Sequence, residues 1–81
     1  MIKTEVIVRF LHQFFAERGT ILPPDWESFN FIQAGVLDSF EILTMVVSIE
    51  THFSLNIPTT LLADEKNAEL GKFVRALQDL S

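Results

Sequence analysis

The chain of 81 residues contains no cysteine, which excludes both a disulfide-stapled fold and a zinc site with cysteine ligands. Its two histidines, His12 and His52, are too few for a convincing metal site, and we expect none. Only six lysine and arginine residues are present and they are scattered, so a nucleic-acid-binding surface is not expected. The net charge of −5 is more typical of a domain that meets basic protein surfaces, although many proteins are acidic for solubility alone.

Long hydrophobic runs are also missing, and none approaches the length needed to span a bilayer. The apolar segment at residues 1–15 is interrupted by Arg9 and His12, and no small-residue cleavage site follows it, so it is a poor signal peptide. We therefore expect no membrane insertion and a cytoplasmic protein.

Hydrophobic side chains are abundant: they make up 48% of the residues and include eight phenylalanines. This is enough for one compact core without disulfides, and we expect residues 1–81 to form a single domain. No segment shows a persuasive strand pattern. The sequence predicts an all-α fold, a small four-helix bundle with three main helices, one short helix and a long loop after the first helix.

Four segments have the character of helices: residues 3–18, 39–53, 60–63 and 68–80. Gly19 is a plausible C-cap for the first helix, and Asn67 is a possible cap for the last. The buried stripes of these two helices are expected to be Ile7, Phe10, Leu11, Phe14 and Leu70, Phe73, Val74, Leu77.

The connection over residues 19–37 is long for so small a domain and needs anchors or a function. Pro23 and Pro24 break regular structure within it. Its candidate anchors into the core are Ile21, Leu22, Trp26, Phe29, Phe31 and Ile32. For Trp26, packing is favoured over contact with a ligand.

The second helix begins with a capping signal, because Asp38 is a good N-cap and Glu41 follows three positions later. At 100° per residue its core face is expected to be Ile42, Met45, Val46, Ile49 and Phe53. A second apolar stripe, Phe40, Leu43 and Val47, falls well away from this face. Either the long loop covers this stripe or the stripe is open to a partner.

Ser39 lies between the N-cap and the apolar run, and it is a poor candidate for a catalytic nucleophile. There is no G-x-S-x-G elbow around it. His52 follows thirteen residues later on the same helix, which is roughly 20 Å away at about 1.5 Å per residue. His12 is not excluded by spacing, but Asp38 would be occupied with backbone N–H groups. We do not expect a self-contained enzyme.

The position of Ser39 suits a phosphate ester instead. Free backbone N–H groups and the positive end of the helix dipole favour an anion at the first residue of a helix. The serine would then be a substrate for modification rather than a catalyst.

Residues 35–58, GVLDSFEILTMVVSIETHFSLNIP, resemble the acyl carrier proteins. That family carries 4′-phosphopantetheine on the serine of an Asp-Ser-Leu motif, which here reads Asp38-Ser39-Phe40. The family's Phe-x-x-x-Ile-Pro ending is present from Phe53 to Pro58. The order of helix, long loop, motif helix, short helix and last helix also fits the whole chain.

The resemblance implies that Ser39 accepts 4′-phosphopantetheine from coenzyme A through a phosphopantetheinyl transferase, with Asp38 beside the site. It also implies that a loading ligase for acyl or aminoacyl groups and acyl-transfer or synthase enzymes dock transiently on a monomer. The positions that match the family's partner-binding residues are Phe40, Leu43 and Val47, which are apolar, and Glu41 and Glu50, which are acidic.

Family members can also hold an acyl chain in a hydrophobic cavity between helices. Any such cavity here would be lined by Met45, Val46, Ile49, Leu61 and Leu62, unless the phenylalanines fill the core.

The chain departs from the family pattern in three places. Phe40 replaces the more usual leucine or methionine. The motif helix has fewer acidic residues than is usual in the family, because it contains Thr44, Ser48, Thr51 and His52. The segment over residues 59–71 is slightly longer than usual. These differences suggest a specialised carrier, similar to the D-alanyl carrier proteins that hold aminoacyl groups. The alternative is a helical protein-interaction domain of the same fold that is never modified.

Overall fold

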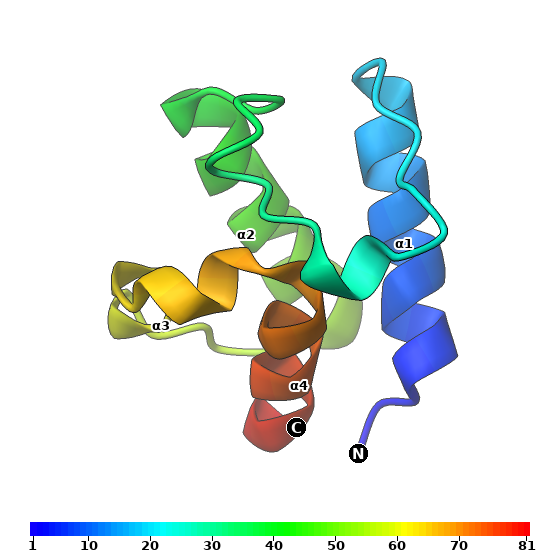
Figure 1. Ribbon diagram of the computed structural model, residues 1–81. Coiled ribbons are helices and arrows are strands. Elements are labelled where there is room, and N and C mark those ends of the chain that lie inside the picture. Colours follow the sequence, from blue (N-terminus) through cyan, green and yellow to red (C-terminus); the bar gives the residue numbers. More distant parts are fainter.

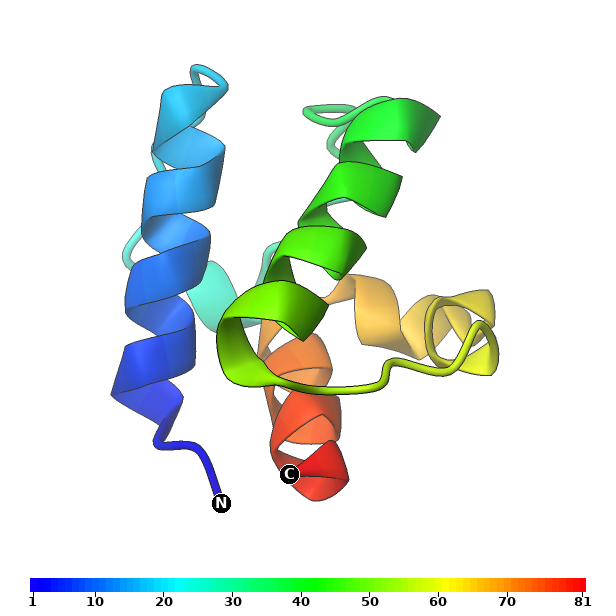
Figure 2. The same ribbon diagram turned by 180° about the vertical axis from the view of Figure 1, so that it is seen from behind.

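The computed structural model describes all 81 residues and is all-α, as the sequence predicts. Its helices are α1 (Thr4–Glu17), α2 (Ser39–Phe53), α3 (Thr60–Ala63) and α4 (Leu70–Leu80), with 3-10 turns η1 (Trp26–Ser28) and η2 (Glu65–Ala68). Helices α1 and α2 run alongside each other and diverge toward the end where α1 finishes and α2 starts, while α4 fills the other end (Figures 1 and 2). No helix is long and apolar enough to cross a bilayer.

The core is one cluster of fourteen buried side chains drawn from all four helices and the long loop. They are Ile7, Leu11, Phe14, Phe15, Leu22, Phe31, Leu37, Met45, Ile49, Leu61, Leu70, Phe73, Val74 and Leu77. The stripes predicted for the first and last helices are confirmed, except that Phe10 is only half-buried. On α2, Met45 and Ile49 are fully buried, and Ile42 and Phe53 pack against the cluster. Val46, also predicted for the core face, is half-buried and lies outside the cluster.

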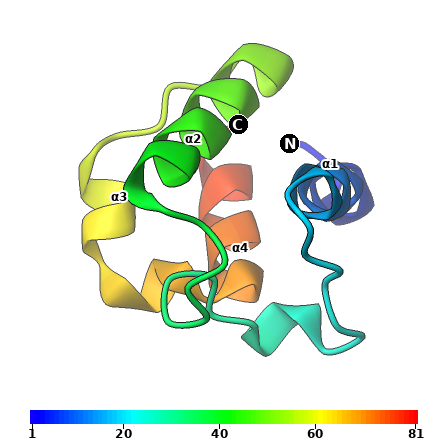
Figure 3. The same cartoon turned by 90° about the horizontal axis from the view of Figure 1, so that it is seen from above.

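The long loop crosses above α4 on its way from α1 to α2 (Figure 3). Leu22 and Phe31 anchor it in the core, and Trp26 and Phe29 pack against the core while half-buried. Short backbone pairing fixes its middle, because the Phe31 N–H donates to the Ala68 carbonyl at 3.1 Å. The loop is therefore a packed part of the bundle and brings α2 to a defined start.

Two of the predicted loop anchors are wrong. Ile21 is 80% exposed and Ile32 is 45% exposed. Ile21 precedes the buried Leu22 in a segment without regular structure, so no helical or strand period specifies which of its side chains is buried. Ile32 follows the buried Phe31 in a turn that the Asn30 side chain holds, since its Oδ1 accepts the Ile32 N–H at 3.1 Å.

The predicted start of the last helix is also wrong, because α4 begins at Leu70 and its N-cap position is Glu69. Residues 65–68 form η2, whose first turn is capped by Asp64 accepting from the Lys66 N–H. Asn67 does not cap α4. Its Nδ2 donates to the Leu61 carbonyl at 2.7 Å, which ties η2 back to α3.

Candidate functional site

Ser39 is the first residue of α2 and is exposed. The predicted capping box is present beside it: Asp38 Oδ1 accepts from the Glu41 N–H at 2.7 Å, and Glu41 Oε1 accepts from the Asp38 N–H at 3.0 Å. The Ser39 hydroxyl has no hydrogen-bond partner in the protein, and neither do the N–H groups of Ser39 and Phe40. A free hydroxyl therefore lies next to free N–H donors at a capped helix start.

The chain just before Ser39 is held in place. Leu37 is buried in the core cluster, and Val36 packs against that cluster. Gly35 turns the chain with φ of +65°, in the left-handed region that glycine enters without strain. These contacts fix the position of the start of α2 at the surface of the bundle, where Ser39 is exposed.

The second apolar stripe of α2 is open to solvent. Phe40 is 76% exposed, Leu43 60% and Val47 51%, so the long loop does not cover them. We call these three residues the α2 ridge. The prediction left two alternatives for the stripe, and the structure selects the open one. Exposed apolar side chains in a contiguous patch are typical of a surface that meets another molecule.

The two predicted acidic partner residues both have contacts within the protein. Glu41 closes the capping box, and its Oε2 lies 3.9 Å from Nε of Arg18, the C-cap residue of α1. Glu50 is half-buried, and its Oε2 accepts the Ile57 N–H at 2.8 Å. The sequence analysis missed this second bond. Contact of either carboxylate with a partner stays a prediction.

A groove of about 240 Å³ lies beside Ser39, between α2 and the segment that leads into α3. We call it the Ser39 groove. Its lining is Ser39, Ile42, Leu43, Val46, Ile57, Pro58, Thr59 and Leu62. No charged side chain and no histidine lines it.

Most of the residues expected to line an acyl cavity between the helices do not line one. Val46 and Leu62 do line the Ser39 groove. Met45, Ile49 and Leu61 do not, because all three are buried in the core cluster. The available apolar space is thus an open groove on the surface of the bundle.

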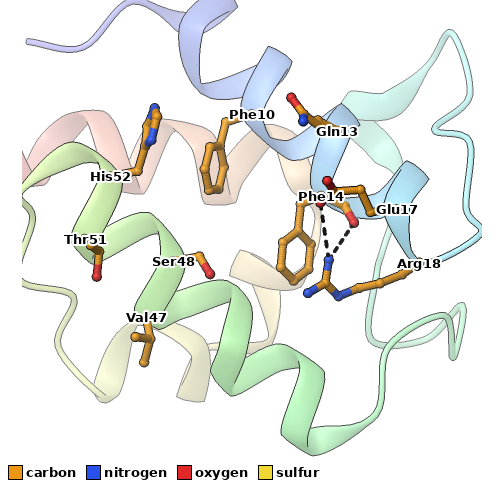
Figure 4. Close-up of a pocket in the computed structure, with 9 residues that line it drawn as sticks. All are labelled: Phe10, Gln13, Phe14, Glu17, Arg18, Val47, Ser48, Thr51 and His52. Carbon is orange, nitrogen blue, oxygen red and sulfur yellow. Dashed lines mark hydrogen bonds and ion pairs between the residues drawn. The ribbon is translucent and has the colours of Figure 1, made fainter.

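A second and larger cleft, of about 600 Å³, separates α1 from α2 on the other flank of α2 (Figure 4). Phe10 and Phe14 project into it from α1, and the Arg18 guanidinium lies 3.6 Å from the centre of the Phe14 ring. Arg18 also donates from Nη1 to the Phe14 carbonyl at 3.0 Å. The His52 ring packs against Phe10 in a tilted arrangement, with centroids 4.8 Å apart and planes at 36°, at the opposite end of α2 from Ser39.

The sequence analysis did not predict this cleft. Its signals were the four-residue spacing of Phe10, Phe14 and Arg18 on one helix, and of Ser48 and His52 on the other. The spacing alone does not show that two helices diverge. Of the two spaces, only the smaller groove reaches Ser39.

No protein-family model matches the chain, and neither the curated proteins nor the solved structures contain a match. What the chain does is therefore inferred from the residues around Ser39 and from the surface next to them.

Proposed function

We propose that the chain is an acyl carrier protein, which holds acyl or aminoacyl intermediates as thioesters on a 4′-phosphopantetheine arm attached to Ser39. The observation that supports this most directly is the exposed, unpartnered Ser39 hydroxyl at the start of α2, immediately beside the exposed α2 ridge. A serine that served only as part of a helix cap would use its oxygen as an acceptor, but here Asp38 fills that role.

The proposed attachment makes one bond and breaks one. The Ser39 oxygen forms an ester to the phosphorus nearer the pantetheine of coenzyme A, and the bond of that phosphorus to the bridging pyrophosphate oxygen breaks. The leaving group is adenosine 3′,5′-bisphosphate, and the hydroxyl proton passes to a base on the transferase. The attached arm supplies the thiol on which cargo is carried.

The helix start suits the resulting phosphodiester. The free N–H groups of Ser39 and Phe40 and the positive end of the α2 dipole all favour a negative charge there. Asp38 adds a negative charge nearby, but its Oδ1 is bonded to the Glu41 N–H. The chain's own role is thus to fix the serine and to accommodate the charge of its ester.

The α2 ridge is the proposed docking surface for the enzymes that modify, load and unload the carrier. These are a phosphopantetheinyl transferase, a loading ligase and acyl-transfer or synthase enzymes. Phe40, Leu43 and Val47 would bury their exposed surface on docking, and the net charge of −5 would steer partners with basic surfaces. Contacts of Glu41 and Glu50 with a partner would fix the orientation of the docked partner and contribute little to the binding free energy. The carrier would work as a cytoplasmic monomer.

Intact-mass measurement tests the proposal. The protein is incubated with coenzyme A, Mg²⁺ and a broad-specificity phosphopantetheinyl transferase, alongside Ser39→Ala and the control Ser48→Ala on the same helix. We expect a gain of one phosphopantetheinyl group in the wild type and in Ser48→Ala, and none in Ser39→Ala. Absence of the gain in folded protein, also after co-expression with the transferase of the native host, would rule the carrier out.

The rival is an interaction domain that is never modified, and the same exposed α2 ridge supports it. It predicts that Ser39→Ala retains function in the cell while a charge on the ridge abolishes it. The carrier predicts that both substitutions abolish function.

A further inference from the structure

The end of α1 is connected to the start of α2 by a single ion pair. The two helices diverge at this end of the larger cleft (Figure 2), and Arg18 Nε lies 3.9 Å from Glu41 Oε2 across the gap. The other two ion pairs of the protein join residues no more than three positions apart in the sequence. The Arg18–Glu41 pair is therefore the one charged contact that reaches from α1 to the helix that carries Ser39.

The Arg18 side chain is already fixed by its contacts with α1. Its guanidinium lies 3.6 Å from the centre of the Phe14 ring, and its Nη1 donates to the Phe14 carbonyl at 3.0 Å (Figure 4). Phe14 belongs to the core cluster, and the Arg18 side chain is only 25% exposed. Surface ion pairs usually contribute little, in part because two flexible side chains have to be ordered. Here the arginine is ordered by Phe14, so pairing with Glu41 orders little more.

Glu41 has a different neighbour for each of its two carboxylate oxygens. Oε1 accepts the Asp38 N–H at 3.0 Å, and Oε2 faces Arg18. A carboxylate with both oxygens engaged has one favoured orientation, and turning it toward solvent would give up both contacts. The N–H that it holds belongs to the residue just before Ser39. A continuous set of contacts thus runs from the core through Arg18 and Glu41 to the backbone beside Ser39.

We propose that Arg18 is a positioning residue for the modification of Ser39. It acts through the Glu41 carboxylate, which it holds between the end of α1 and the capping box, so that the start of α2 keeps one position relative to the rest of the bundle. A transferase then meets the Ser39 hydroxyl in a fixed place and does not have to order it during the reaction. The role in modification rests on the proposed function, whereas the contact through Glu41 does not.

Arg18 acting as a charge alone would have the opposite effect on the reaction. The chain has a net charge of −5 and is expected to attract transferases with basic surfaces. Removal of a positive charge beside Glu41 would strengthen that attraction and lower KM. Loss of positioning would instead lower kcat, because the bound serine would spend less time in the reacting geometry.

Three variants and one control test the proposal. Arg18→Gln removes the charge that faces Glu41, and Glu41→Gln keeps an acceptor oxygen for the capping box but removes its partner's charge. The third variant combines both substitutions. The control is Lys72→Gln, which breaks the 3.6 Å ion pair with Glu69 beside α4 and changes the net charge by the same amount as Arg18→Gln.

Two measurements are made on each protein. Amide hydrogen exchange of Asp38, followed by NMR, reports the hydrogen bond to the Glu41 carboxylate without any carrier chemistry. It is compared with exchange of the Ile49 amide in the middle of α2, so that a general loss of stability is not mistaken for a local one. The second measurement gives kcat and KM for modification of Ser39 by the transferase and coenzyme A.

We expect the Asp38 amide of Arg18→Gln to exchange about two- to fivefold faster than in the wild type, the range for one ion pair, with little change at Ile49. The kcat for modification should fall by a similar factor, and KM should not fall. The double variant should match Glu41→Gln, because without the carboxylate Arg18 has no charge to hold. Lys72→Gln should leave Asp38 exchange and kcat unchanged.

Three results would overturn the proposal. The first is an unchanged Asp38 exchange rate in Arg18→Gln. The second is a double variant in which the effects of the two substitutions add, because Arg18 would then act independently of Glu41. The third is an Arg18→Gln protein with unchanged kcat, with or without a lower KM, which would leave Arg18 at most a role as a charge.

Failure of this inference is distinguishable from failure of the carrier proposal. If wild-type Ser39 is never modified, the carrier fails and with it the role of Arg18 in the reaction, while the Asp38 exchange rate still shows whether Arg18 holds the start of α2. If wild type and Arg18→Gln are modified with equal kcat, the carrier stands and the positioning role fails.

Discussion

The Glu50 carboxylate accepts a hydrogen bond from the Ile57 backbone N–H at 2.8 Å, across the turn that ends α2. The chain reverses in this turn through Ser54, which has a φ of 55° in the left-handed region. A half-buried charged acceptor thus fixes the segment that carries Ile57 and Pro58 along the Ser39 groove. An acidic residue matched to partner binding by its position in the sequence has a structural contact of its own.

Removal of this contact should destabilise the fold. We expect Glu50→Ala to lower the free energy of unfolding by about 1.5–3 kcal/mol, the range for hydrogen bonds to charged groups. Glu50→Gln keeps an acceptor oxygen and should lose clearly less. Urea denaturation of both variants measures this. Equal stability of Glu50→Ala and the wild type would show that the hydrogen bond contributes nothing, and would return Glu50 to a role in partner contact alone.

Helical periodicity and capping chemistry were enough to predict the buried stripes of the first and last helices and the cap of α2, but not the start of α4. The stripes on the first and last helices and the Asp38–Glu41 box depend on spacing along one helix, so they can be read from the sequence. The exposure of the α2 ridge could only be stated as one of two alternatives. Whether a loop covers a stripe depends on the path of residues 19–37 in space, which no local pattern specifies.

Tertiary hydrogen bonds could not be predicted from the sequence for the same reason. Asparagine is a residue type that often caps helices, but the Asn67 amide donates to the Leu61 carbonyl across a turn. The Glu50 carboxylate similarly accepts from the Ile57 N–H. Leu61 was expected beside a cavity and is instead buried in the core cluster. These outcomes follow from how α3 and η2 fold back on each other, which short-range signals do not encode.

Gly71 marks a close approach between α4 and η1. A Cβ at this position would lie 2.9 Å from the Glu27 carbonyl oxygen, so the backbone of η1 would have to move. Glycine to alanine within a helix normally stabilises by about 0.5–1 kcal/mol. Here we expect Gly71→Ala to destabilise by about 1–3 kcal/mol, as overpacking does.

Thermal unfolding of Gly71→Ala, with Lys72→Ala as the exposed neighbour in the same helix, measures the effect. Lys72→Ala should change the free energy of unfolding by about 0.5 kcal/mol or less. A Gly71→Ala protein that is more stable than the wild type would mean that η1 is not held against α4 in solution.

The capping box should be needed for stability, and the charge of Asp38 should not. Asp38→Ala removes the acceptor for the Glu41 N–H and should cost about 1 kcal/mol. Asp38→Asn retains an acceptor oxygen and should be nearly as stable as the wild type. If the proposed modification of Ser39 needs only a well-formed helix start, Asp38→Asn should be modified at close to the wild-type rate in the mass assay. A folded Asp38→Asn protein that resists modification would instead assign the carboxylate a direct part in the reaction.

The α2 ridge should separate docking from folding. Because Leu43 is 60% exposed, Leu43→Glu should leave the free energy of unfolding within about 0.5 kcal/mol of the wild type. The same change places a charge in the proposed docking surface, so kcat/KM for modification of Ser39 should fall at least tenfold, mainly through KM.

Met45→Ala is the matched control for Leu43→Glu, on the buried face of α2, and it should lose about 2–5 kcal/mol of stability. At temperatures where Met45→Ala remains folded, its Ser39 should be modified with an unchanged KM, because the ridge is intact. A Leu43→Glu protein that is modified at the wild-type rate would place the docking surface elsewhere, whereas one that unfolds would show that the ridge is covered in solution.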